Sequence, residues 1–98
     1  MSVQMIIELQ EEHEAQTVLK AIEAYKLRLQ AGLARTRRRL RVFEQRYKVD
    51  TNDFLKNMAA EDLEGGDLEY VVWAGEAQLL EGLITELAEL EHASYQLP

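Results

Sequence analysis

The arginines of residues 35–41, which read RTRRRLR, are the side chains with the clearest potential for chemistry. An arginine-rich helix can bind the phosphates of a nucleic acid. The same guanidinium groups can instead pair with carboxylates of this chain, of neighbouring protomers or of an acidic partner protein. Residues 49–98 hold twelve acidic residues and one basic residue, a surplus that would repel phosphates. We therefore expect pairing within the chain or between protomers, with Arg35, Arg38 and Arg39 as binding residues.

Other residue types form no catalytic pattern. The two histidines, His13 and His92, do not make the paired histidine-and-acid spacing of a helical metal site. The carboxylates form neither an EF-hand loop nor a pair of ExxH motifs, and no glycine-rich phosphate loop is present. The serines, Ser2 and Ser94, have no triad partners. We expect a protein that is not an enzyme and that uses no metal or cofactor.

Aromatic residues gather near the middle of the chain. Tyr70 and Trp73 stand three residues apart, where a helix would place both on one face. Core packing against Phe43, Tyr47 and Phe54 is the simpler interpretation. The alternative is a protein-binding hot spot, because Trp and Tyr beside a charged rim are typical of interfaces.

Length and composition indicate one small helical domain over residues 1–98, with five glycines, one proline and no cysteine. The net charge of −7 is unevenly distributed, since residues 26–48 hold nine basic residues and one acidic residue. No apolar window reaches the length of a membrane span, and residues 1–9 lack a basic signal-peptide region. We expect a cytoplasmic protein with no membrane association.

A long helix is predicted over residues 11–49. Apolar or core-compatible residues recur there at spacings of three and four through about four heptads. They are Leu19, Ile22, Tyr25, Leu29, Leu33, Thr36, Leu40, Phe43 and Tyr47. A helix of this length must pack on something, because propensity alone does not stabilise it.

A second helix is predicted over residues 67–92, with Asp67 as its N-cap. Its apolar stripe is formed by Leu68, Val71, Val72, Gly75, Leu79, Leu83, Leu87 and Leu90. The opposite side carries acids alone, namely Glu69, Glu76, Glu81, Glu86, Glu89 and Glu91. Such a helix needs an apolar and basic partner, and the segment around Arg35–Arg41 is one.

The predicted architecture is all-α, a long antiparallel helical hairpin with a short helix at the turn. The short helix spans residues 51–60, with Asp50 or Thr51 as its cap, and residues 93–98 form a tail. Residues 1–10 alternate in nearly period two, which permits a short strand or an extended arm, or the first turn of the helix. We expect the packing residues to be Leu33, Leu40, Phe43, Tyr47, Phe54, Gly75, Leu79 and Leu83.

The segment 43–75 resembles a family of small prokaryotic helical-hairpin proteins. It joins an FExxY helix end, an FL pair in a short helix and a GDxxxxxWAG helix start. The matching positions are Phe43, Glu44, Tyr47, Phe54, Gly66, Asp67, Trp73, Ala74 and Gly75. The family members look like type II antitoxins, so the resemblance implies an antitoxin that masks a basic, ribonuclease-like toxin.

Three functions follow as hypotheses. The first is a protein–protein interaction module, in its specific form an antitoxin, with binding residues Tyr70, Trp73, Glu76, Glu81, Arg35, Arg38 and Arg39. The second is a self-assembling coiled-coil or four-helix-bundle structural protein. The third is a nucleic-acid-binding helix through Arg35–Arg41. The first two predict a homo-oligomer, a dimer or larger.

Overall fold

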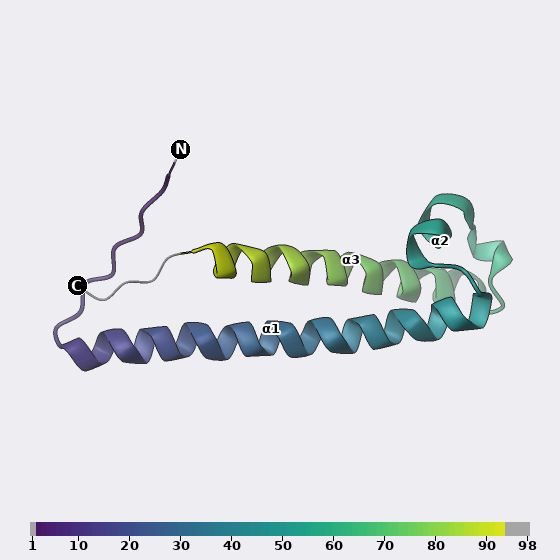
Figure 1. The fold of residues 1–98 in the computed structure, drawn as a ribbon. Coiled ribbons are helices and arrows are strands. Elements are labelled where there is room, and N and C mark those ends of the chain that lie inside the picture. Colours follow the sequence, from purple (N-terminus) through teal and green to yellow (C-terminus); the bar gives the residue numbers. More distant parts are fainter. Residues whose placement is uncertain (1, 94–98) are drawn as a thin grey trace.

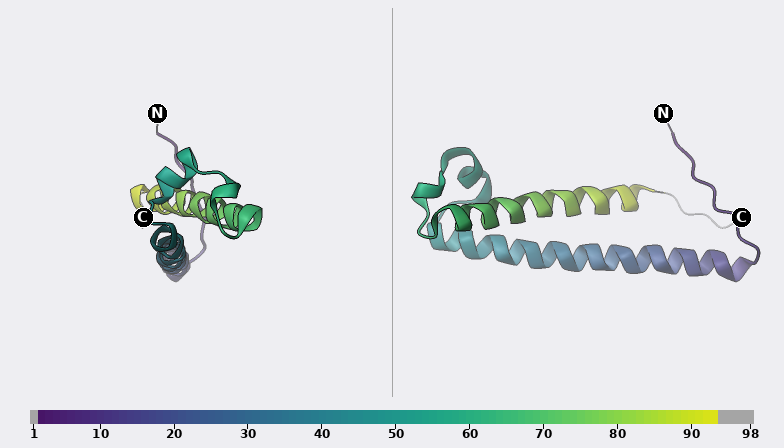
Figure 2. Two further views of the ribbon diagram at one scale, coloured as in Figure 1. Left: turned by 90° about the vertical axis from the view of Figure 1, so that its right-hand side faces the viewer. Right: turned by 180° about the vertical axis from the view of Figure 1, so that it is seen from behind.

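The computed structural model describes residues 2–93 of the 98, and it confirms the helical hairpin. The chain forms α1 (Glu12–Tyr47), α2 (Thr51–Asn57), the 3₁₀ turn η1 (Ala60–Asp62) and α3 (Gly66–His92). Helices α1 and α3 run antiparallel, and α2 lies over the closed end of the hairpin (Figure 1, Figure 2). The molecule is a rod with extents of 59 × 28 × 19 Å. No helix in residues 2–93 is long and apolar enough to cross a membrane.

Helix α1 buries the row that its spacing predicts only from Leu29 onward, because Leu19 and Ile22 are half-buried and Tyr25 is 40% exposed. Leu29, Leu33, Thr36 and Leu40 are buried, while Phe43 and Tyr47 are half-buried at its carboxyl end. The helix is slightly shorter than the predicted 11–49, because Lys48 adopts the left-handed conformation, with φ 56°, and ends it. Gly32 is also buried in α1. A Cβ at this position would lie 3.5 Å from Leu83 Cδ1 of α3, an ordinary van der Waals contact.

The turn contains two short helices where one was predicted. Asp50 caps α2 by accepting a hydrogen bond from the backbone N–H of Asp53 at 2.7 Å. Helix α2 ends at Asn57 rather than at residue 60, and η1 follows it. Asp62 stabilises η1 by accepting a hydrogen bond from the backbone N–H of Ala59 at 2.8 Å. The backbone N–H of Gly66 bonds to Leu63 O at 3.1 Å and leads into α3.

The core lies at the closed end and is largely aromatic. Phe54 of α2 and Trp73 of α3 are completely buried, and their rings stack with centroids 3.8 Å apart. Phe43 and Tyr47 of α1 also stack on Trp73, at 5.2 and 5.7 Å. The side chain of Leu63 completes the buried cluster. Three helices that are individually marginal are therefore joined by one stack of rings.

The predicted stripe of α3 is wrong in its first half. Trp73, Ala77 and Leu80 pack against the core, whereas Gly75 and Leu79, both predicted to pack, are exposed. The buried face of α3 is rotated about the helix axis relative to the predicted stripe. The reason is Trp73, whose large ring stacks on Phe54 of α2 and so turns its own side of α3 toward the core. Leu83 and Leu87, farther along the helix, are half-buried as predicted.

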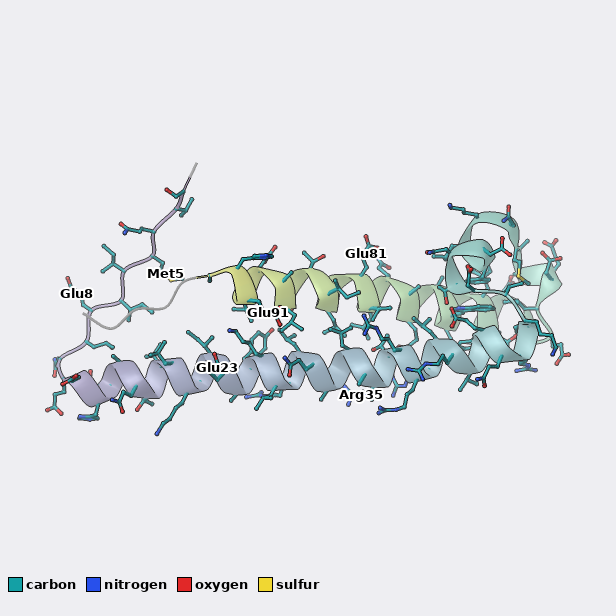
Figure 3. The ribbon with its side chains drawn as sticks, viewed as in Figure 1. Met5, Glu8, Glu23, Arg35, Glu81 and Glu91 are labelled. Atoms are coloured by element: carbon teal, nitrogen blue, oxygen red, sulfur yellow. The ribbon has the colours of Figure 1, made fainter. Side chains whose placement is uncertain are left out.

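Residues 2–10 form neither a helix nor a strand, so the short strand is not formed and the extended arm is. Met5 and Glu8 lie on this arm, which runs away from the helices (Figure 3). A single strand has no neighbour to satisfy its backbone, which explains why the period-two pattern does not produce a sheet here. Of the predicted tail, residues 94–98 lie outside the described part of the chain.

Candidate protein-interaction surface

An apolar surface remains exposed on α3, on the side that faces away from the aromatic core. We call it the α3 outer face and define it by residues at helical spacing: Leu68, Val71, Val72, Gly75, Leu79 and Gly82. Leu68 is 76% exposed, Val71 65%, Val72 45% and Leu79 48%. Four large aliphatic side chains along some 20 Å of one helix are more than the scattered apolar residues of an ordinary surface.

The α3 outer face is hollowed at its two glycines. A Cβ added at Gly75 or at Gly82 would meet nothing within 4 Å. An open hollow of about 440 Å³ lies there, lined by Gly75, Gln78, Leu79, Gly82, Leu83 and Glu86. Large side chains therefore alternate with hollows along this face. Side chains of another helix could pack into these hollows.

Ion pairs follow the flank where α1 meets α3. Arg39 Nη1 lies 3.0 Å from Glu76 Oε1, and Glu76 is largely buried. Arg46 bonds to Glu69 at 2.8 Å and to Glu64 at 2.7 Å, and these contacts, first with Glu64 and then with Glu69, raise the pKa of the Arg46 guanidinium. These three pairs help to fix the register of the hairpin. The predicted pairing of the arginine segment with the acidic helix is confirmed for Arg39.

The other arginines of the segment point elsewhere. Arg35, Arg37, Arg38 and Arg41 are exposed, and none forms an ion pair within residues 2–93. Glu81 likewise forms none with the described residues, and Figure 3 shows Arg35 and Glu81 on opposite outer edges of the hairpin. One adjacent helix can contact only part of a helix's circumference, so these arginines stay available to a partner.

The predicted hot-spot residues belong to the core. Trp73 has no exposed surface, and Tyr70 is half-buried against Phe54 with ring centroids 5.0 Å apart. The interface interpretation of Trp73 is therefore wrong, because α2 folds over the ring. Glu76 binds Arg39 through Oε1 and is largely buried, with its Oε2 left without a hydrogen-bond partner among the described residues, so the exposed surface lies instead on the aliphatic side of α3.

The Trp73 indole is held by hydrogen bonds that the sequence did not reveal. Its Nε1–H donates to Thr51 Oγ1 at 3.1 Å, and the Thr51 hydroxyl donates to Glu44 Oε2 at 2.9 Å. Glu44 also accepts from the backbone N–H of Thr51 at 2.8 Å. The position of Thr51 at the start of a capped helix was the available signal. These contacts position the three helices of the closed end relative to one another.

A second hollow of about 630 Å³ lies between the three helices on another side of the hairpin. Its lining mixes apolar residues with both signs of charge: Arg37, Leu40, Arg41, Glu44, Asp50, Thr51, Asn52, Leu55, Ala77, Leu80, Glu81, Ile84 and Thr85.

At the start of α1, three side chains come within ligand distance of one another. Oxygen or nitrogen atoms of Glu11, His13 and Glu14 lie within 4.8 Å, and His13 Nδ1 is 3.0 Å from Glu11 Oε2. His13 and Glu11 are mostly exposed, and Glu14 already accepts a hydrogen bond from the backbone N–H of Gln10. Such an exposed cluster is an ordinary feature of an acidic helix start.

No family model, curated protein sequence or solved structure that was compared with this chain matches it. The residues behind the antitoxin resemblance have a structural explanation in this fold. Phe43, Tyr47, Phe54 and Trp73 form the aromatic core. Gly66 has φ +61° at the start of α3, a conformation that favours glycine. The motif therefore specifies the closed end of a hairpin.

Proposed function

We propose that this protein is a non-catalytic protein–protein interaction module that functions as part of an assembly. The observation that carries the proposal is the α3 outer face, an apolar surface with hollows at its glycines that no element of residues 2–93 covers. The core-facing polar groups of the closed end are occupied by one another. Binding through shape and apolar contact is what such a surface can do.

The exposed area of the isolated chain supports assembly. Its accessible surface is 7872 Å² at a mass of 11.3 kDa. A compact monomer of that mass exposes about 5,700 Å², so the excess is roughly 2,100 Å². A standard interface buries about 800 Å² on each partner, and obligate interfaces bury more. Although the extended arm contributes to it, the excess is large enough for an extensive interface.

The specific form of the proposal is an antitoxin that binds a basic toxin. Acids lie around the ends of the α3 outer face, at Asp67, Glu86 and Glu89, and they suit a basic partner. A partner with apolar contacts at its centre and basic residues at its edge would match the surface. Binding to such a partner would also stabilise a thin hairpin by mass action.

The experiment is light scattering on a sizing column, first with the protein alone and then with the product of the adjacent gene. We expect a mass above 11.3 kDa in at least one of the two runs. A defined hetero-complex would support the antitoxin form, and its affinity should fall with added salt. A homo-oligomer that ignores the neighbour would support the structural form. A monomer in both runs would overturn the proposal.

Nucleic-acid binding is the weaker candidate, and the exposed arginines Arg35, Arg37, Arg38 and Arg41 are the observation in its favour. Binding through these arginines requires retention on heparin at low salt and a steep loss of affinity as salt rises. Substitution of Arg38 and Arg41 by Glu would then abolish retention. We expect no retention of the unmodified protein, because its net charge is −7.

A further inference from the structure

The α3 outer face has a sequence of shapes that is complementary to its own reverse. Along the helix, Val72, Gly75, Leu79 and Gly82 read as large, hollow, large, hollow. Read from the other end, the same four positions are hollow, large, hollow, large. Two copies that meet antiparallel can therefore place each large side chain over a glycine of the other copy.

We propose that a second copy of this chain covers the α3 outer face, with the two α3 helices antiparallel about a two-fold axis. In this register Leu79 of each copy lies over Gly75 of the other, and Val72 lies over Gly82. Leu68 of each copy then lies at the level of Glu86 of the other. The inference rests on the proposed function, since it names the partner of the same surface.

A parallel pair would not use the relief. In a parallel, in-register pair Leu79 would overlap with Leu79 of the other copy, whereas Gly75 would lie opposite Gly75 and leave a void. Antiparallel helices also place opposite ends of their dipoles together. Shape and dipole therefore favour the same orientation.

The charges on this side of the hairpin permit the antiparallel contact. The centre of the face, from Val72 to Gly82, carries no ionised side chain, and Glu76 at its edge is neutralised by Arg39. The antiparallel register brings Asp67 of the second copy toward the Glu86 end of the face, so acids of the two copies approach each other at both ends and added salt should strengthen the dimer.

The exposed area permits such a contact. Each chain exposes roughly 2,100 Å² more than a compact monomer of its mass, an excess shared between the extended arm and the sides of the rod, and one partner in a standard interface buries about 800 Å². A two-fold contact along some 20 Å of α3, flanked by the side chains of α1, draws on this excess in both copies equally.

The first test replaces both glycines by glutamine. Gly75→Gln and Gly82→Gln fill the hollows of the dimer, yet within one chain a Cβ meets nothing within 4 Å at either site. Glutamine is also the better helix former. We expect an unmodified protein of twice 11.3 kDa, and a double variant with equal or greater helical circular dichroism whose dimer dissociation constant is about a hundredfold higher.

The matched control is Ala34→Gln, which adds the same amide to an exposed position of α1 away from α3. It should leave the dimer mass unchanged. A dimer that survives the double glycine substitution would overturn the inference while leaving the proposed function intact. An unmodified protein that is monomeric alone, but forms a complex with the adjacent gene product, would do the same. A monomer under both conditions would defeat both.

The second test fixes the register by disulfide trapping, which is clean because the chain has no cysteine. A tagged Leu79→Cys variant mixed with an untagged Gly75→Cys variant should form a mixed disulfide under mild oxidation. Leu79→Cys alone should form little, because its two sulfurs lie on opposite sides of the axis. Dominant self-crosslinking of Leu79→Cys would indicate a parallel pair and overturn the register. A dimer that crosslinks in neither experiment would show that another face forms the contact.

Discussion

Trp73 of α3 donates a hydrogen bond from Nε1 to Thr51 Oγ1 of α2 at 3.1 Å. The two residues are 22 positions apart in sequence, and their bond connects α2 with α3. The Thr51 hydroxyl continues to Glu44 of α1 at 2.9 Å. Each of the three helices therefore contributes one group to a single chain of hydrogen bonds. The aromatic stack lies beside it, so the closed end of the hairpin has both its packing and its polar connections in one place.

Removal of the Trp73 ring should be the most damaging single change in the chain. Trp73→Ala leaves a cavity among Phe43, Tyr47 and Phe54 and should cost about 3–5 kcal/mol in free energy of unfolding. A domain this small has little more stability than that. Chemical denaturation followed by circular dichroism measures the loss. Trp73→Phe keeps most of the stack and should cost clearly less; equal stability of the alanine variant would contradict the structure.

The polar connection can be tested apart from the packing. Thr51→Val keeps the shape of the side chain but removes the oxygen that accepts from Trp73 and donates to Glu44. We expect a loss of about 1–3 kcal/mol, because the buried indole N–H is left without an acceptor. Thr51→Ser restores the hydroxyl and should recover most of the stability. The comparison is made in denaturant titrations of the two variants under the same conditions.

Sequence patterns predicted the hairpin because the buried row of α1 is long and regular. Leu29, Leu33, Thr36 and Leu40 are all buried as the spacing requires. The same reasoning failed on α3, where two apolar faces compete and Leu68, Val72 and Leu79 form the more regular one. Rotation of α3 is decided by the contact of Trp73 with Phe54, two residues from different helices, and periodicity within one helix cannot reveal that contact.

The binding residues were harder to predict than the fold for the same reason. The arginine segment was expected to pair with acids of the second helix, and one of its members, Arg39, forms an ion pair with Glu76. Trp73 was considered as a possible exposed binding residue, because the sequence does not show the path of the turn that places α2 over its ring. The α3 outer face could not be predicted from the sequence, because it is identified only when the residues of α3 that pack against the core are known.

Stability should fall at alkaline pH through Tyr47. Its hydroxyl donates to Glu69 and accepts from the backbone N–H of Glu64, and burial first, then the bond to Glu69, raises its pKa above 10.0. A phenol whose pKa is higher in the folded state contributes stability that is complete below about pH 10 and is lost as pH rises through the folded pKa. Tyr47→Phe should therefore show a shallower decrease in stability above that pH.

The measurement for Tyr47 is the difference between the two proteins in melting temperature from pH 8 to pH 11. Other groups titrate in the same range, and the subtraction removes their contribution. Tyr25, whose pKa is also raised by a hydrogen bond to Glu86, remains in both proteins. Parallel curves for the unmodified protein and Tyr47→Phe would show that the Tyr47 hydroxyl is not coupled to folding.

The two residues with positive φ predict opposite effects of substitution. Gly66 begins α3 with φ +61°, and a Cβ there would meet nothing within 4 Å, so Gly66→Ala has room but an unfavourable backbone. It should destabilise the protein by about 1 kcal/mol. Lys48 ends α1 with φ 56°, so Lys48→Gly removes a strain and should stabilise by about 0.5–1 kcal/mol. Lys48→Ala is the control, because alanine keeps the Cβ and should give no gain. Thermal melts of the three variants decide the matter, and a stabilised Gly66→Ala would show that α3 does not begin in the left-handed conformation.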